Sequence, residues 1–191
     1  MKSLKGSVTE KNLLKAFAGE SQARSRYSFF AAVARKAGFE QIADIFLVTA
    51  ENEREHAKVF FKYLEGGDVE ITASYPAGII GDTAANLKAA ADGEKMEWSK
   101  LYADFEKTAK QEGFDEIAKR FKEIGEVEAQ HEKRYRKFLE NVQKGKVFKR
   151  DVVTKWRCRN CGYVHEGPSA PDKCPACDHP QAYYELLAEN Y

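Results

Sequence analysis

Two Glu-x-x-His motifs are the residues of this chain best suited to bind a metal. Glu53 and His56 form the first motif, and Glu128 and His131 form the second, 75 positions later. Residues three apart lie on the same face of a helix, so each Glu and its His can reach one metal site. Carboxylate oxygens combined with imidazole nitrogens suit iron or manganese.

Three further glutamates are predicted to face the same interior. Glu94 and Glu97 lie among apolar residues at helical spacing, and Glu20 lies between Phe17 and Tyr27 on a similar stripe. Buried carboxylates without compensating charge are very costly, so the converging glutamates predict two metal ions. A single Glu-x-x-His motif is more often a solvated surface pair, and the prediction therefore depends on both copies and their partner glutamates.

The motifs belong to a longer internal repeat. Gly38–Phe39 matches Gly113–Phe114, and Tyr27 matches Tyr102, all at an offset of 75 residues. The repeated unit is predicted to be a helical hairpin, and two copies make a four-helix bundle. We expect the two halves to face each other across a pseudo-twofold axis, with the metal site near that axis.

Start and stop signals along the chain predict the helices that would position these ligands. Short connections within each hairpin and one long crossover over 68–81 suit a ferritin-like bundle. The expected helices run from the Ser7 cap to Gly38, from about Glu40 to Glu65, from Asp82 or Thr83 to about Glu112, and from Gly113 to about Lys144.

Spacing alone leaves two features of the stripes open. Glu97 has no counterpart in the first half of the repeat, where Gln22 or Ala23 stands. It is either an extra ligand that competes for one metal, or a solvated residue or one that supports the ligands from outside their set. Tyr27 and Tyr102 either donate hydrogen bonds to ligand carboxylates or bond to the backbone, because buried phenols need partners.

All four cysteines lie near the C-terminus, in two Cys-x-x-Cys pairs separated by 12 residues. This spacing predicts a tetrahedral thiolate site, which fits zinc or iron, and spacing alone favours structural zinc. The residues around the pairs, with Gly162 after the first pair and Pro175 within the second, resemble the knuckles of rubredoxin, a one-iron electron carrier. The predicted ligands are Cys158, Cys161, Cys174 and Cys177.

Composition divides the chain into a bundle over 1–145, a linker over 146–155 and a metal-binding module over 156–191. The module is too short for an apolar core of its own and needs a metal to fold. We expect Trp156, Tyr163 and Tyr184 to pack beside its metal site.

Overall composition indicates a globular protein, with 32% charged and 43% hydrophobic residues. No run of 18 apolar residues exists, so no membrane span is expected. The first residues lack the apolar core of a signal peptide, which predicts a cytoplasmic location. The net charge of +1 gives no argument for a nucleic-acid partner.

Together, the ligand motifs and the cysteine tail closely resemble the rubrerythrin family over essentially the whole chain. The resemblance implies a mainly α fold: a ferritin-like four-helix bundle with one long crossover, plus a small rubredoxin-like domain. It also implies two non-haem iron ions in the bundle and one iron in the four-cysteine site. A homodimer is expected, in which the thiolate iron of one subunit lies near the di-iron site of the other.

The resemblance further implies a role for each bundle ligand. Glu53 and Glu128 would bridge the two irons, and Glu20 would be terminal on the first iron. Glu94 and His131 would bind the second iron.

The activity implied is the reduction of hydrogen peroxide to water, as protection against oxidative stress. His56 would bind the first iron in the reduced form and Glu97 in the oxidised form, and Tyr27 and Tyr102 would join them as catalytic groups. The chain lacks a dinucleotide-binding motif, so electrons would come from a separate rubredoxin or flavoprotein reductase. Any link to NADH would run through that protein.

Two alternative functions remain open. A ferroxidase or oxidase on the same bundle would use oxygen, but the appended electron-transfer module argues against it, because ferroxidation takes electrons from the iron substrate. A metal-binding or iron-storage protein with a structural zinc site would show no turnover, and zinc also fits both sites.

Overall fold

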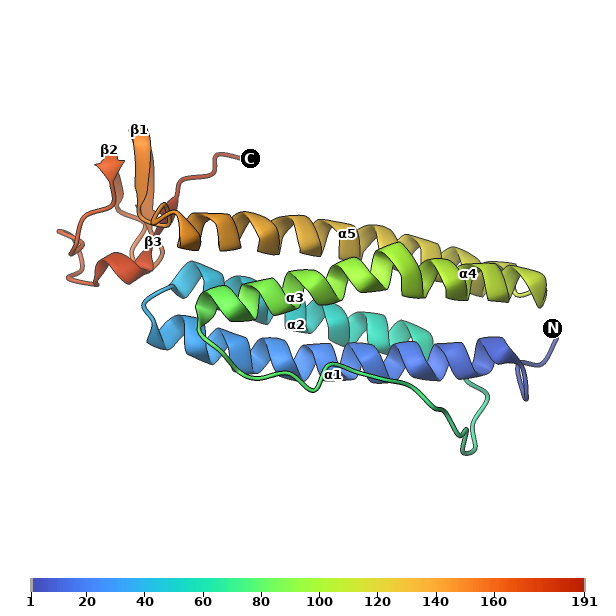
Figure 1. The fold of residues 1–191 in the computed structure, drawn as a ribbon. Coiled ribbons are helices and arrows are strands. Elements are labelled where there is room, and N and C mark those ends of the chain that lie inside the picture. Colours follow the sequence, from blue (N-terminus) through green and yellow to red (C-terminus); the bar gives the residue numbers. More distant parts are fainter. Residues whose placement is uncertain (1, 191) are drawn as a thin grey trace.

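The computed structural model describes residues 2–190, which form a four-helix bundle with a small sheet at one end (Figure 1). The architecture confirms the predicted mainly helical fold with one long crossover. Within these residues no helix is both long and apolar enough to cross a bilayer. The bundle consists of α1 (Val8–Lys36), α2 (Glu40–Phe61), α3 (Thr83–Met96), the π-helical segment η1 (Glu97–Leu101), α4 (Tyr102–Gln111) and α5 (Asp115–Gln143).

The two hairpins of the repeat turn at equivalent glycines. Gly38 has a φ of +81° and Gly113 a φ of +76°, in the left-handed region that glycine adopts without strain. After each glycine, the next residue donates its N–H to the carbonyl five residues earlier, at 2.9 and 2.8 Å. These matching helix caps confirm the repeat at the level of backbone hydrogen bonds.

Side-chain caps fix where two of the helices begin. Ser7 Oγ accepts from the N–H of Glu10 at 2.9 Å, as the capping pattern predicts. Asp82 Oδ1 accepts from the N–H of Ala85 at 2.8 Å, so Asp82 rather than Thr83 is the cap of α3.

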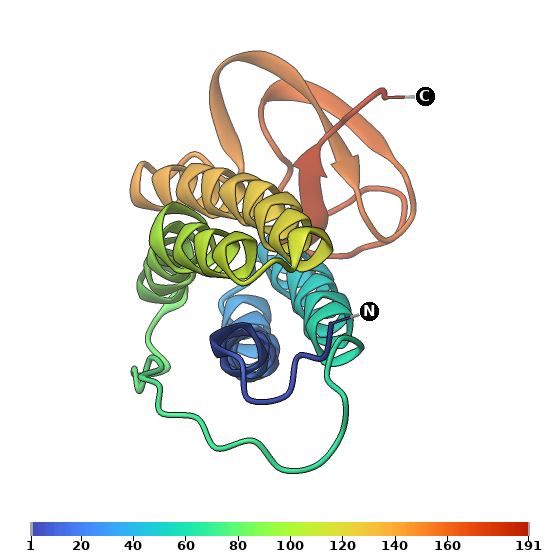
Figure 2. The ribbon, with the colours of Figure 1, turned by 90° about the vertical axis from the view of Figure 1, so that its right-hand side faces the viewer.

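The crossover between the hairpins runs along the outside of α1 (Figure 2). It is held there by two hydrogen bonds, from the Tyr75 hydroxyl to the Lys15 carbonyl at 2.9 Å and from Gln22 Nε2 to the Pro76 carbonyl at 2.8 Å. It starts earlier than predicted, because α2 ends at Phe61. The expected last residue of that helix, Glu65, instead accepts hydrogen bonds from Ser3 and Leu4 of the N-terminal segment.

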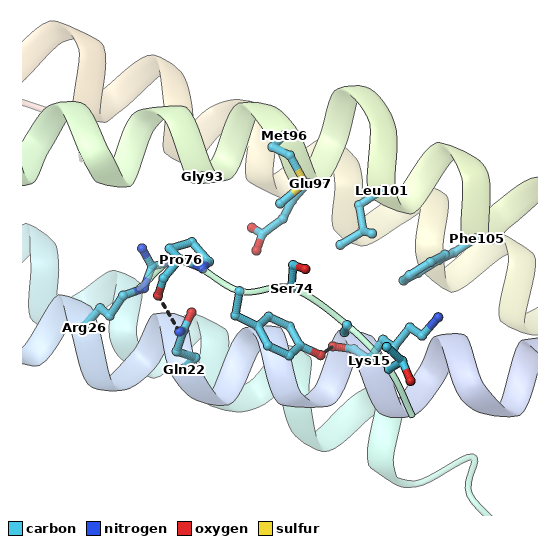
Figure 3. Close-up of a pocket in the computed structure, with 13 residues that line it drawn as sticks. Lys15, Gln22, Arg26, Ser74, Pro76, Gly93, Met96, Glu97, Leu101 and Phe105 are labelled. Carbon is cyan, nitrogen blue, oxygen red and sulfur yellow. Dashed lines mark hydrogen bonds between the residues drawn. The ribbon is translucent and has the colours of Figure 1, made fainter. Parts of the chain in front are cut away.

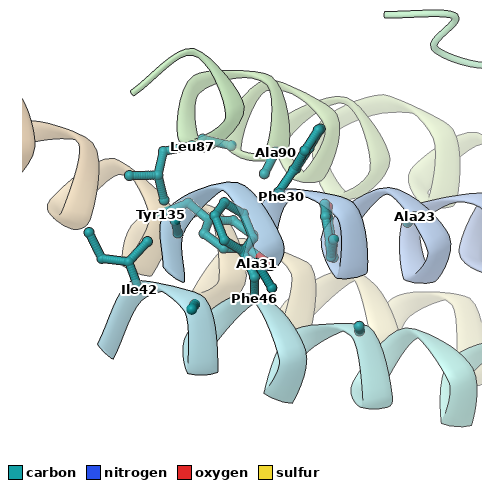
Figure 4. Close-up of a cluster of buried hydrophobic side chains, with 13 residues drawn as sticks. Ala23, Phe30, Ala31, Ile42, Phe46, Leu87, Ala90 and Tyr135 are labelled. Carbon is teal, nitrogen blue, oxygen red and sulfur yellow. The ribbon is translucent and has the colours of Figure 1, made fainter. Parts of the chain in front are cut away.

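Buried apolar side chains form two clusters along the bundle. In the first, the Phe46 ring lies 5.6 Å from Phe30 and 5.2 Å from Tyr135 between centroids (Figure 4). In the second, Phe60 and Phe121 stack at 5.1 Å. On every helix of the bundle a buried glutamate lies between members of the two clusters, so a carboxylate layer separates two apolar regions: Glu20, Glu53, Glu94 and Glu128.

The third helix of the bundle is interrupted, although the sequence predicts one continuous helix to Glu112. Over Glu97–Leu101 the backbone is π-helical, and the N–H of Tyr102 donates to the Glu97 carbonyl five residues earlier. A π-turn inserts an extra residue into the helix. Both Glu94 and Glu97 are buried around this insertion, with 1% and 8% of their surfaces exposed.

The C-terminal module is a three-stranded antiparallel sheet in the order β2-β1-β3. Its core contains Trp156, Tyr184 and two of the cysteines. Tyr163 is 37% exposed, so the prediction that it joins this core is wrong. The elements are β1 (Lys149–Cys158), β2 (Val164–Ser169), the short 3₁₀ helix η2 (Gln181–Tyr183) and β3 (Tyr184–Leu186).

Strand β1 begins inside the segment predicted to be a linker, 146–155. Lys149 pairs with Ser169 and Thr154 pairs with Gly167 across the sheet. Pairing with a strand further along the chain decides this boundary, and local composition does not reveal such pairing.

The module contacts the end of the bundle where α1 turns into α2. Phe148 stacks on Phe39, with ring centroids 6.0 Å apart, and Arg159 forms an ion pair with Asp44 of α2. A stacked apolar pair and an ion pair therefore fix the module to one end of the bundle.

We expect Gly113→Ala to lower the melting temperature of the metal-loaded protein by about 2–4 °C, because a left-handed alanine costs about 1 kcal/mol. Gly78→Ala is the matched control, since Gly78 lacks a positive φ and a Cβ there would have no neighbour within 4 Å among the described residues. Equal melting temperatures for the two variants would contradict the turn geometry.

Candidate metal centres

Two groups of ligand atoms meet in the carboxylate layer of the bundle. In each group, ligand atoms from four side chains lie within 4.8 Å of one another. Glu53 and Glu128 belong to both groups, as residues placed between two metals must. The first group is Glu20, Glu53, His56 and Glu128, and the second is Glu53, Glu94, Glu128 and His131.

Each imidazole faces carboxylates of both hairpins. His56 Nδ1 lies 3.0 Å from a Glu53 oxygen and 2.8 Å from a Glu128 oxygen. His131 Nδ1 lies 2.7 Å from Glu128 and 3.3 Å from Glu53. Helical spacing puts each Glu and His on one face, and the packing of the hairpins brings the two faces together.

These ligand atoms are buried without good hydrogen bonds. Within residues 2–190, both oxygens of Glu53 and Glu128 and the Nδ1 atoms of His56 and His131 lack a partner of acceptable hydrogen-bond geometry, despite their short separations. Buried polar atoms without partners are costly, so atoms that converge in this way require cations between them. The mixed oxygen and nitrogen donor set fits iron.

Two tyrosines hold the terminal carboxylates across the repeat. The Tyr27 hydroxyl donates to Glu94 Oε1 at 2.5 Å, and the Tyr102 hydroxyl donates to Glu20. Each tyrosine therefore bonds to a glutamate of the opposite hairpin. Of the two roles that spacing leaves open, the structure shows donation to the carboxylates.

The pKa values of the buried glutamates also indicate that the carboxylate layer needs additional positive charge. Burial and the neighbouring carboxylates raise the pKa of Glu20 and of Glu97 well above the usual range. For Glu97, the charge of Arg26 opposes this shift only weakly. Burial and the charge of Glu53 raise the pKa of Glu94 to about 8. Bound cations would relieve all of these costs.

The two imidazoles compensate part of the charge. Burial would raise the pKa of Glu128, but short contacts with His131 and His56 lower it to about 2. Burial would lower the pKa of both imidazoles, yet contacts with Glu128 and Glu53 raise it to about 9 for His56 and about 12 for His131. The layer thus contains more carboxylates than its two imidazoles can neutralise.

Glu97 lies outside both ligand groups of the described chain. Its carboxylate points from η1 into a pocket between the helices and the crossover (Figure 3). His56 is in the first group and Glu97 is not, and the predicted exchange of these two ligands stays a prediction. Arg26 lines the same pocket; sequence reasoning missed it, because nothing in its spacing separates it from a solvated arginine.

The four cysteines form the third centre. The Sγ atoms of Cys158 and Cys177 lie 3.8 Å apart, and those of Cys161 and Cys174 lie 3.6 Å apart. A tetrahedral site with metal–sulfur bonds of about 2.3 Å has sulfur–sulfur edges of about 3.8 Å. The observed separations therefore fit one tetrahedral metal ion, and all four thiols are free of disulfides.

The two cysteine knuckles share one turn geometry. Gly162 and Asp178 each follow the second cysteine of a pair, and both have a positive φ, of +81° and +61°. Each donates its N–H to the carbonyl of the first cysteine of its pair, at 2.9 Å. The backbone N–H of His179 then reaches Cys177 and, as the largest cause, lowers the pKa of that thiol to about 6. Such donors stabilise thiolate charge.

Ligand groups for two metals between the hairpins of a bundle, with a four-cysteine site at its end, define a di-iron carboxylate protein of the ferritin-like class with a small thiolate module. The family model for rubrerythrin matches residues 11–139, and the model for the rubredoxin-like domain of rubrerythrin matches residues 156–185. The chain belongs to the rubrerythrin family, whose members are generally oxidoreductases.

Individual relatives agree with this membership. Rubrerythrin from Porphyromonas gingivalis is 62% identical over 190 residues, covering 100% of this chain and 95% of that protein. Rubrerythrin from Nitratidesulfovibrio vulgaris is 60% identical over 191 residues, with full coverage of both. The structure of fully reduced nigerythrin is 31% identical, with a TM-score of 0.64, and covers 97% of this chain and 89% of that one.

Family membership decides the cofactors. They are two non-haem iron ions in the bundle and one iron in the four-cysteine site, and the ligand groups described above fit them. Iron, rather than the zinc that spacing alone favours, therefore belongs in the cysteine site. The assignment of individual ligands to individual ions stays a prediction.

We expect the bundle without its di-iron ions to lose thermal stability as the pH rises from about 5 to about 8. The folded-state pKa of Glu94 is raised to about 8, so folding favours its protonated form and stability falls above the unfolded pKa. The raised pKa of His56 acts in the same direction above its unfolded value. Melting temperatures of the chelated protein across this range measure the effect.

The matched control is Glu94→Gln, which carries no charge at this position and should show a smaller decline over the same pH range. A melting temperature that increases with pH in the chelated wild-type protein would mean that the carboxylates are not held as described.

Proposed function

We propose that this protein is a peroxidase that reduces hydrogen peroxide to water and so protects against oxidative stress. The observation that carries the proposal is the presence, in one chain, of a di-iron carboxylate domain and a rubredoxin-like domain. When bound, the two ferrous ions supply the two electrons that O–O cleavage needs and act as Lewis acids.

The ligand groups support one assignment of the bundle residues. Glu53 and Glu128 would hold both ions, since both side chains belong to both groups. Glu20 would hold the first ion, and Glu94 and His131 would hold the second. In the four-cysteine site, both knuckles contribute their two sulfurs.

The remaining catalytic roles belong to side chains that exchange as metal ligands and to side chains that hold or move protons. His56 would hold the first ion in the reduced form, and Glu97 would hold it in the oxidised form. Burial chiefly raises the pKa of Tyr27 and of Tyr102 well above the usual range, so both hydroxyls stay protonated and keep donating. Glu97, whose carboxylate points into the pocket, can accept a proton from the substrate and pass it to a leaving oxygen.

Electrons reach the bundle from a separate rubredoxin or flavoprotein reductase, in the cytoplasm, through the four-cysteine iron. Within one subunit this path is long. Arg159, next to Cys158, pairs with Asp44 of α2, and His56 lies further along that helix by about 18 Å at 1.5 Å per residue. This separation supports a homodimer in which the cysteine module of the partner subunit lies nearer the di-iron site.

Anaerobic stopped-flow spectroscopy of the fully reduced protein tests the proposal. Mixing with hydrogen peroxide should restore the visible band of the ferric thiolate centre quickly, and mixing with oxygen should restore it slowly. Faster recovery with oxygen would replace the peroxidase by an oxidase. Absence of the band would mean that the cysteine site does not carry electrons.

Cys161→Ser should abolish turnover driven by the external reductase, because one thiolate ligand is lost. A single turnover of the reduced di-iron centre should survive, since that centre lies in the bundle. Rapid mixing with one equivalent of peroxide separates the two steps. Glu166→Gln, an exposed change in the same module, is the matched control, and full reductase-driven turnover in Cys161→Ser would exclude the module as the electron donor.

A further inference from the structure

A pocket of about 240 Å³ lies beside the di-iron ligands, between α1, the crossover, α3 and η1 (Figure 3). The crossover forms one of its walls and is tied to α1 through Tyr75 and Gln22. Glu97 of η1 is its only wall residue among the seven glutamate and histidine side chains assigned to the di-iron site. A molecule in the pocket therefore meets the di-iron centre at Glu97.

Three charged side chains line this pocket: Lys15, Arg26 and Glu97. The last two face it from opposite walls. Glu97 points into it from η1, and Arg26 points into it from α1. Arg26 Nε is buried and has no hydrogen-bond partner within residues 2–190. Its guanidinium lies over the Tyr27 ring, 5.8 Å from the centroid, which fixes it beside the site. A buried donor without a partner is costly, and a ligand that accepts from it would remove that cost.

We propose that this pocket is the docking site for the peroxide, with Arg26 donating a hydrogen bond to a peroxide oxygen and Glu97 accepting one from a peroxide hydrogen. The inference rests on the proposed function and deepens it. A hydroperoxide is both a hydrogen-bond donor and an acceptor, so it is complementary to a carboxylate facing a guanidinium. Water is also complementary, but the pocket is larger than water or hydrogen peroxide requires.

The rest of the lining extends the substrate class to small alkyl hydroperoxides. The pocket also has apolar walls that can hold an alkyl group. They are formed by Ala73, Pro76, Met96, Leu101 and Phe105. The O–O bond of the hydroperoxide breaks, two electrons come from the same protein reductant, and two protons are taken up. The products are one alcohol and one water.

The binding role of Arg26 is tested first by kinetics. Arg26→Gln should raise the KM for hydrogen peroxide about tenfold or more with a smaller effect on kcat, because a hydrogen bond from a charged donor is lost. Arg26→Lys, which keeps a charged donor, should restore part of the affinity. An unchanged KM in Arg26→Gln would overturn the assignment.

A larger side chain in the apolar wall tests whether this wall binds the alkyl group. Ala73→Trp should lower the ratio of kcat/KM for tert-butyl hydroperoxide to that for hydrogen peroxide about tenfold, because the added ring fills the wall that holds the alkyl group. Ala77→Trp, four residues further along the crossover and outside this pocket, should leave that ratio unchanged. Equal ratios in both variants, or no turnover of tert-butyl hydroperoxide by the wild type, would refute the wider substrate class.

A readout independent of turnover comes from crystals of the anaerobically reduced holoprotein soaked in tert-butyl alcohol, the unreactive product of tert-butyl hydroperoxide. Density in the pocket of the wild type, with an oxygen next to Arg26, and its loss in Arg26→Gln, would support the site. Density in both proteins would indicate binding at crystal concentration only and would overturn the proposed site. An empty pocket in the wild type would also overturn it. If the protein turned over no peroxide, the proposed function would be wrong. The soak would still show whether the pocket binds the alcohol.

Discussion

The burial of a layer of carboxylates inside an apolar bundle is the constraint on which the rest of this structure depends. Four glutamates, one from each helix of the bundle, lie between two apolar clusters, and two imidazoles neutralise only part of their charge. Such a layer is tolerable only if cations occupy it. The fold of the bundle and its loading with metal are therefore one problem, because the same side chains that would destabilise the metal-free core hold the ions.

The repeat makes this layer nearly symmetric, and the function that we propose depends on where the symmetry fails. Tyr27 and Tyr102 each brace a carboxylate of the opposite hairpin, so the hairpins are joined by equivalent bonds. Glu97 has no such counterpart, and it lies on a π-helical insertion that has no equivalent in the first hairpin over the described residues 2–190. Insertions of this kind are frequent at functional sites. The asymmetry places one extra carboxylate between the ligand groups and the pocket.

The cysteine module, outside the bundle, likewise depends on metal ligands for its fold. It has too few apolar residues for a large core, and its four sulfurs, at separations typical of a tetrahedral site, hold its knuckles together. A stacked aromatic pair and the ion pair between Arg159 and Asp44 fix it to one end of the bundle. Its position relative to the di-iron site is thus set by packing, and the thiolate environment by backbone N–H groups.

The bundle, the ligand motifs and the cysteine knuckles could be predicted from the sequence, because helical periodicity and ligand spacing are local properties of the chain. Four features could not: which carboxylate each tyrosine binds, where η1 interrupts the helix, that β1 starts at Lys149, and that Arg26 faces Glu97. Each of these depends on contacts between segments far apart in the sequence. Spacing along one helix fixes the face of a side chain, but its partner is fixed only when another helix or strand packs against that face.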